Sequence, residues 1–179
     1  MGNVKFTGYF TPVLRVRKKP NSQYKYPIYR YPKKWKGKLP SRRTIEGESA
    51  LDSFNLEIAY AKSKLDIYFM QVQGSGYIEF PNGKRKLLAH EGTNKHPYRS
   101  IGRHLVNQQI IEAKSVSMSG IKRFLNRNPD MRDSVLFYNP SYTFFTPQKS
   151  KPRGAGLVPL TADHSIAVDT KYIPLGSIL

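Results

Sequence analysis

Residues 69–78 read Phe69-Met70-Gln71-Val72-Gln73-Gly74-Ser75-Gly76-Tyr77-Ile78, and this stretch decides the predicted fold. Apolar and polar residues alternate up to Gln73, which predicts one strand over residues 65–73 and another over 76–80. On a strand, Gln71 and Gln73 face the same side, and the small residues that follow let a ligand approach the backbone. The stretch therefore predicts a polar shelf for a hydroxyl-rich ligand. The alternative, favoured on residue type alone, is that these amides satisfy neighbouring backbone groups.

The flanking segments predict a domain that is mainly β. Pro81-Asn82-Gly83-Lys84 predicts a hairpin turn, and residues 85–91 the returning strand. Residues 1–14 read as a strand that ends in a turn at Thr11-Pro12. The basic, Tyr- and Pro-rich residues 15–43 read as irregular chain or edge strands, because X-Pro steps disfavour helix.

Short helices and a boundary complete this prediction. Capping residues and apolar spacing predict helices over residues 44–48, from Ser100, over 117–126 and over 129–137. The basic, Pro/Gly-containing residues 146–156 predict a linker between domains. Strand, turn and strand are expected over 157–179.

The composition points to an anionic environment. The chain has 179 residues, of which 30 are Lys or Arg and 12 are Asp or Glu, so its net charge is +18. Such a charge suits nucleic acid, anionic lipid or an acidic cell-wall polymer without choosing among them. There is no cysteine, which excludes disulfides, and the four histidines do not fall at metal-ligand spacing. No apolar run reaches membrane-spanning length and no signal peptide is recognised, so if the protein is exported, its signal is expected outside this chain.

Three further features each allow two interpretations. Tyr98-Arg99-Ser100 places an arginine before a helix, where it suits an anion such as a substrate carboxylate, or pairs with an acid. Asp169 ends an apolar strand and either orients a second acid or caps a turn. The tyrosine-containing basic run over residues 15–38 resembles a nucleic-acid surface, or is solvated charge on an edge ribbon.

Several short blocks run along almost the whole chain in a fixed order. They are Gly8–Pro12, Tyr26–Tyr29, Leu39–Arg42, Gln71–Gly76, His96–Gly102, Val116–Met118, Asn139–Phe145, Val158–Thr161 and Ala167–Asp169. In this order they resemble the MltA family of lytic murein transglycosylases.

The resemblance implies a fold and an activity. The fold is mainly β, with a small β-barrel domain and a few short helices inserted into a double-psi β-barrel that is incomplete in this chain. Residues 1–12 would be a strand of the double-psi barrel, 13–148 the inserted domain, and 149–179 the start of the barrel's C-terminal part. The activity is a lyase reaction on peptidoglycan that breaks the bond between N-acetylmuramic acid and N-acetylglucosamine. The sugar's own C6 hydroxyl attacks C1, which leaves a 1,6-anhydro end.

The resemblance also implies a site. Its substrate-binding residues would be Tyr9, Gln71, Gln73, Gly74, Ser75, Gly76, Tyr98, Arg99 and Ser100. One carboxyl group with a raised pKa acts first as acid and then as base, and no metal or organic cofactor is implied. The first of three family aspartates matches Asp169, a supporting carboxylate, whereas the catalytic one is expected beyond Leu179. This chain alone is therefore expected to be an inactive fragment.

Two positions depart from the family pattern. Lys95 stands where a glycine is usual, which would disturb a tight turn if that glycine has a positive φ. Ser119 stands where glutamine is usual.

The expected setting follows the family. The partner would be peptidoglycan glycan strands bound by a monomer, at the periplasmic face of the outer membrane, with a lipoprotein anchor outside this chain. A glycan-binding module without catalysis and a basic nucleic-acid-binding protein are the alternatives, and the order of the blocks argues against the second.

Overall fold

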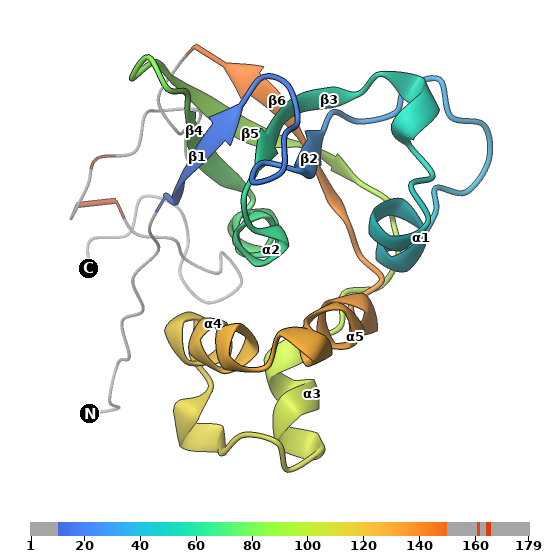
Figure 1. Ribbon diagram of the computed structural model, residues 1–179. Coiled ribbons are helices and arrows are strands. Elements are labelled where there is room, and N and C mark those ends of the chain that lie inside the picture. Colours follow the sequence, from blue (N-terminus) through green and yellow to red (C-terminus); the bar gives the residue numbers. More distant parts are fainter. Residues whose placement is uncertain (1–10, 150–160, 162–163, 166–179) are drawn as a thin grey trace.

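The computed structural model describes residues 11–149, 161 and 164–165. Its strands gather at one end of the molecule and helices α3–α5 at the other, with α2 lying between them (Figure 1). In this described part, no helix is both long and apolar enough to cross a membrane.

Six strands form one sheet. They are β1 (Val13–Arg17), β2 (Tyr26–Tyr29), β3 (Glu57–Ala61), β4 (Ser75–Glu79), β5 (Arg85–Thr93) and β6 (Thr143–Gln148), in the spatial order β2-β3-β1-β4-β5-β6. Strands β1 and β4 pair in parallel, and every other neighbouring pair is antiparallel. The sheet curls, so that Tyr31 beyond edge strand β2 meets Phe144 on edge strand β6 at a ring-centroid distance of 5.5 Å. The predicted mainly β fold is confirmed, with the expected small barrel appearing as a strongly curled sheet.

Five α-helices surround this sheet. They are α1 (Arg42–Gly47), α2 (Lys64–Gln73), α3 (Ile101–Asn107), α4 (Met118–Arg127) and α5 (Arg132–Tyr138), with 3-10 turns at Asp52–Phe54, Ala113–Ser115 and Pro129–Met131. Serine hydroxyls cap α1 to α4 by accepting a backbone N–H of the first turn. The capping residues are Ser41, Ser63, Ser100 and Ser117. The helices predicted from Ser100 and over 117–126 are confirmed, and those near residues 44–48 and 129–137 are present with shifted bounds.

The prediction of a strand over residues 65–73 was wrong, because this segment is helix α2. The Ser63 hydroxyl accepts the N–H of Asp66, which opens the helix. Gly74 closes the helix with φ +80°, a conformation that glycine adopts without a Cβ clash. The apolar residues of α2 are buried on two sides of the helix: Ile67 and Met70 against the sheet, and Leu65, Tyr68 and Phe69 against the other helices. Because the apolar positions are spread around the helix, the 3.6-residue period is obscured in this short segment.

The other expectations near this segment hold. The strand over 76–80 is β4 and its partner over 85–91 is β5. Between them Gly83 donates its N–H to the Phe80 carbonyl, which forms the predicted turn. In the described chain, strand β1 runs from Val13 to Arg17, further into the basic stretch than predicted, and most of the strand expected over residues 1–14 lies outside the described residues. The prediction of a linker from residue 146 was wrong at its start, because residues 146–148 belong to strand β6. The rest of the linker from residue 150, and nearly all of the strands expected over 157–179, lie outside the described residues.

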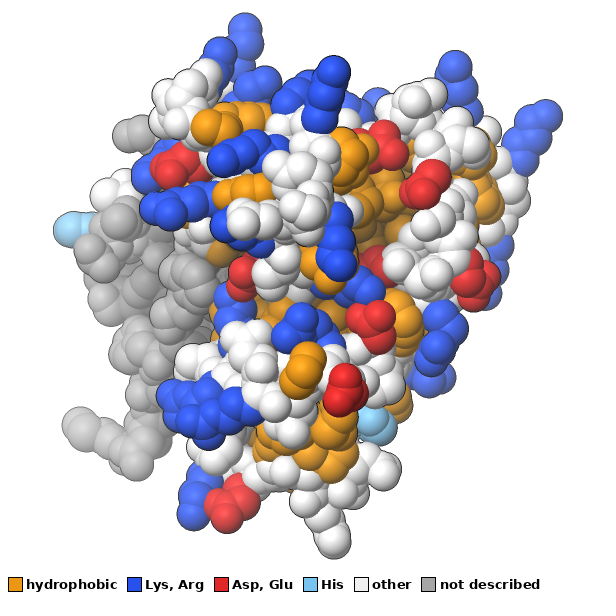
Figure 2. Space-filling view, viewed as in Figure 1, with side chains coloured by type: hydrophobic (Ala, Val, Ile, Leu, Met, Phe, Trp, Pro, Cys, Tyr) orange, Lys and Arg blue, Asp and Glu red, His pale blue; other side chains and the backbone are white. Residues whose placement is uncertain are grey.

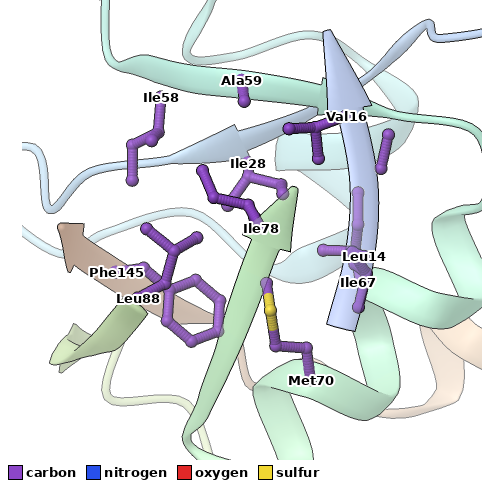
Figure 3. Close-up of a cluster of buried hydrophobic side chains, with 11 residues drawn as sticks. Leu14, Val16, Ile28, Ile58, Ala59, Ile67, Met70, Ile78, Leu88 and Phe145 are labelled. Carbon is purple, nitrogen blue, oxygen red and sulfur yellow. The ribbon is translucent and has the colours of Figure 1, made fainter. Parts of the chain in front are cut away.

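The main core lies between the sheet and α2 (Figure 3). Val16, Ile78 and Leu88 contribute from β1, β4 and β5, and Met70 contributes from α2. A Cβ on Gly76 would lie within 2.6 Å of the Met70 side chain, so this glycine lets β4 approach α2 closely. A second cluster packs the opposite side of α2 against α3, α4 and α5. Helix α2 is therefore the element that joins the sheet to the helical end.

Candidate functional site

The predicted site residues within the described chain fall into two groups. One group, Gln71 to Gly76, covers the end of α2 and the start of β4. The other, Tyr98 to Ser100, leads into α3. Tyr9 and Asp169 lie outside the described residues, so their predicted roles stay predictions.

Gln71 has a structural role in this site. Its side chain is buried, and its Nε2 donates to the Thr143 carbonyl at 3.1 Å. Residues two apart on a helix point about 200° apart around its axis, so the prediction that Gln71 and Gln73 face the same side was wrong. The alternative interpretation, an amide that satisfies a backbone group, describes Gln71 correctly.

Gln73 instead lines a small hollow between β1, α2 and α4. Its walls are Pro12, Val13, Leu14, Asp66, Phe69, Gln73, Met118 and Lys122. The volume is about 190 Å³, below the roughly 300–1,000 Å³ of pockets that enclose a whole drug-sized ligand. The hollow is lined by an aromatic ring, an amide and an ion pair. Its size and lining suit a single hydroxyl-bearing ring that forms one unit of a longer ligand.

An ion pair closes one side of this hollow. The Lys122 ammonium lies 2.6 Å from Asp66 Oδ1 and 5.4 Å from the centre of the Phe69 ring. Both charged side chains are partly exposed, at 33% and 44%. Asp66 is the acidic residue among those that line the hollow, and its carboxylate is paired with Lys122.

The small residues after Gln73 are explained largely by backbone geometry. The Gly74 N–H donates to the carbonyls of Met70 and Gln71, and Gly76 is buried against Met70. Ser75 begins β4 and is half-buried. These residues therefore hold the end of α2 against the sheet beside the hollow.

A buried asparagine fixes the start of the second group. Asn94 Nδ2 donates to the carbonyls of Pro40 and Pro140, at 2.9 and 2.8 Å. Its Oδ1 accepts the N–H groups of Tyr142 and His96. Every polar atom of this amide is used, so the chain entering the Tyr98 segment is firmly held.

A second buried asparagine connects Tyr98 and Arg99 to α2. Asn139 Oδ1 accepts the Arg99 N–H at 3.1 Å, and Asn139 Nδ2 donates to the Tyr68 hydroxyl at 3.2 Å. Burial raises the pKa of Tyr68, and its interactions with the Tyr98 hydroxyl raise it further. Tyr68 on α2 thereby links the group from Gln71 to Gly76 with the group from Tyr98 to Ser100. These two groups are separated by more than 20 residues in the sequence.

The exposed side chains of this segment are Tyr98 and Arg99. Tyr98 is 59% exposed. The Arg99 guanidinium stacks 5.8 Å from the Tyr138 ring centre and makes no ion pair within the described residues. Ser100 caps α3 through its hydroxyl, which is a structural role. Tyr98 and Arg99 are therefore the members of this group that a ligand can reach.

Sequence reasoning missed the buried arginine beneath this segment. Arg42 is 1% exposed, and its guanidinium donates to the Asn139 and Ser141 carbonyls and to Glu46 Oε1 at 2.6 Å. The rings of Tyr68 and Tyr142 cover it at 4.7 and 5.0 Å. The block Leu39–Arg42 marked this position, but no sequence pattern distinguishes a buried arginine from an exposed one.

Burial shapes the electrostatics of this cluster. It raises the pKa of the Glu46 carboxyl, although Arg42 opposes the shift. It also raises the pKa of Tyr142, with Glu46 adding to the effect. Among the described residues, no group of three His, Cys, Asp or Glu is placed to hold a metal ion.

The comparisons with known proteins agree with this architecture. The family model described as the MltA specific insert domain matches residues 5–146. The chain belongs to the MltA family. Its division at residues 12 and 148 stays a prediction, although the match to the insert-domain model covers most of the proposed inserted domain.

Individual MltA proteins are similar over nearly the whole chain. Membrane-bound lytic murein transglycosylase A of Escherichia coli K12 is 41% identical over 99% of this chain and 49% of its own length. The protein of the same name from Vibrio cholerae is 37% identical over 98% of this chain and 48% of its own length. This chain thus spans about half the length of the curated relatives it matches.

A solved structure of E. coli MltA with bound chitohexaose is also similar. Its TM-score is 0.86 at 38% identity, over 97% of this chain and 52% of that one. The MltA fold of this chain is therefore shown by both sequence and structure.

Proposed function

We propose that this chain binds peptidoglycan glycan strands and forms part of a lytic murein transglycosylase. The observation that carries this proposal is the similarity to E. coli MltA with bound chitohexaose, which extends over 97% of the chain. Chitohexaose is a chain of β-1,4-linked N-acetylglucosamine, and it shares the backbone linkage of murein glycan.

The geometry supports a role in holding an extended glycan. Gln73 lines a hollow with the Phe69 ring, and the exposed Tyr98 and Arg99 are joined to the same helix through Tyr68. Amides and aromatic rings are the groups that bind sugar hydroxyls and ring faces, and Arg99 suits a carboxylate. The two groups together provide contacts at more than one sugar position.

The proposed reaction needs one carboxyl group that gives and then takes a proton. In the described residues, Asp66 is engaged by Lys122, and Glu46 is buried against Arg42. We therefore propose that the acid/base carboxyl comes from outside the described part, with Asp169 as a supporting carboxylate. The described residues bind and orient the glycan. Two of the relatives carry "membrane-bound" in their names, and we propose the periplasmic face of the outer membrane as the location.

Calorimetric titration with chitohexaose tests the binding part of the proposal. We expect Gln73→Ala to weaken binding by about three- to tenfold, the effect of losing about one net hydrogen bond. Gln23→Ala is the matched control, because Gln23 is an exposed amide on a distant loop. The absence of chitohexaose binding by the folded wild-type chain would refute the proposal.

Incubation with murein sacculi tests the catalytic part. We expect the chain to sediment with sacculi. Because it spans about half the length of its curated relatives, we expect mass spectrometry to find no 1,6-anhydro-muropeptides released by the chain alone. Release of anhydro products would show that an acid/base carboxyl is present after all. Salt-sensitive binding to DNA without binding to sacculi would favour the nucleic-acid alternative.

A further inference from the structure

Cationic side chains gather at the end of the molecule opposite α3–α5. Strands β1 and β4 are parallel neighbours, so their carboxyl ends lie at the same edge of the sheet. Figure 2 shows Lys and Arg side chains projecting along the top of the molecule, above β1 in the view of Figure 1. We call the residues Arg15, Arg17, Lys18, Lys19, Lys25 and Lys62 the basic end.

Strand register brings the members of the basic end together. Ala61 pairs with both Val16 and Tyr26, so Lys62, the next residue, lies between Arg15 and Lys25 across the sheet. Residues that face each other on neighbouring strands have Cβ atoms about 4.5–5.5 Å apart. Segments far apart in the sequence thus contribute to one cationic surface.

Two tyrosines hold these cations in place. The Arg17 guanidinium lies 4.5 Å, and the Lys62 ammonium 4.9 Å, from the centre of the Tyr24 ring. Lys25 lies 5.4 Å from the Tyr26 ring centre. Attraction between a cation and an aromatic face offsets part of the repulsion among like charges.

Acidic residues do not neutralise this surface. Glu79 lies 3.8 Å from Arg15 but only 2.6 Å from Arg85, so two cations share one carboxylate. Within the described chain, the other five members of the basic end make no ion pair. The exposed Lys84 and Lys86 on the neighbouring hairpin add to the same edge.

We propose that the basic end docks on the surface of a bilayer that contains anionic phospholipids. Its charges are mostly exposed lysines, which act as hydrated point charges rather than as a bidentate grip on one anion. They spread along an edge instead of lining a pocket, which suits a plane of headgroup phosphates. Tyr24 is only 5% exposed, so it is not available to stack on bases as a single-stranded nucleic acid would require.

This docking is independent of glycan binding. The hollow beside Gln73 lies between the start of β1, α2 and α4, and the Tyr98 segment leads into α3. Of the basic end, Lys18, Lys19 and Lys25 lie on the connection between β1 and β2, and Lys62 follows β3, so none of these lysines lines the hollow. The molecule can therefore face a bilayer with one end while the other remains open to a polymer.

Vesicle sedimentation with the full chain tests the proposal. We expect binding to phosphatidylcholine vesicles that contain phosphatidylglycerol, strong loss of binding at high salt, and no binding to phosphatidylcholine alone. The variant K18E/K25E/K62E should bind at least about 100-fold more weakly, since each lost cation contributes about fivefold and each added carboxylate is repelled by the anionic surface. The control variant K114E/R123E/R127E makes the same change in net charge with exposed residues of the helical end, and it should retain most of the binding.

Several results would overturn the proposal. Equal losses in the two variants would show that net charge, rather than the basic end, drives binding. Tighter binding of the wild type to DNA or to sacculi than to anionic vesicles, abolished by K18E/K25E/K62E, would assign the surface to that polymer. Circular dichroism checks that both variants are folded. The salt dependence of vesicle binding by the wild type tests the proposal even where a variant does not fold.

Discussion

At the scale of single residues, Lys95 has an unusual backbone conformation. Its φ is +59°, in the left-handed region that favours glycine, the residue that the family resemblance leads us to expect at this position. This conformation destabilises the folded state by about 1 kcal/mol for a residue that has a Cβ atom. The backbone N–H of Lys95 still donates to Thr93 Oγ1, so the turn is formed in spite of the strain.

We expect Lys95→Gly to raise the free energy of unfolding by about 0.5 kcal/mol, because relief of strain exceeds the added entropy of the unfolded chain. Urea denaturation followed by circular dichroism measures the change. Lys95→Ala removes the same charge but keeps a Cβ, and it should leave stability near that of the wild type. A glycine variant less stable than the alanine variant would contradict this explanation.

At the scale of elements, helix α2 shows what the sequence could and could not predict. The Ser63 cap and Gly74 were readable start and stop signals, and they outweigh the short alternation that suggested a strand. The hairpin, the cap at Ser100 and the helix over 117–126 were predicted correctly, because each depends on a few neighbouring residues. The Arg42 cluster depends on contacts between residues about 100 positions apart, which no local pattern encodes.

The coupling between α2 and the Tyr98 segment can be tested with Tyr68→Phe. This change keeps the ring that covers Arg42 but removes the hydroxyl that receives the Asn139 Nδ2 bond and meets Tyr98. We expect the backbone amides of His96 and of residues 98–100 to exchange with deuterium up to about tenfold faster, the effect of losing about one net hydrogen bond. The control is Tyr60→Phe. Tyr60 is a half-buried residue of β3, and its replacement should leave exchange in the Tyr98 segment unchanged. Equal exchange in the two variants would mean that Tyr68 does not hold the segment.

At the scale of the whole molecule, buried phenols make stability depend on alkaline pH. Burial raises the pKa of Tyr29, Tyr68 and Tyr142, and the hydrogen bond that Tyr29 donates to Asp52 raises its pKa further. These residues lie on β2, on α2 and just before β6, so their ionisation is linked to most of the fold.

The sign of this dependence follows from the raised pKa values. Below about pH 10, the pKa of a free tyrosine, the phenols are protonated in both states and folding is unaffected. Above that pH the unfolded chain releases these protons and the folded chain holds them, so each residue lowers stability by up to about 1.4 kcal/mol per pH unit. We expect absorbance at 295 nm to show a cooperative step above pH 10 in which these three buried phenols ionise together, coinciding with loss of near-ultraviolet circular dichroism. Tyr29→Phe should reduce the amplitude of this step by one tyrosine. A single broad titration with the fold intact would show that these three phenols are accessible to solvent, and would contradict their burial.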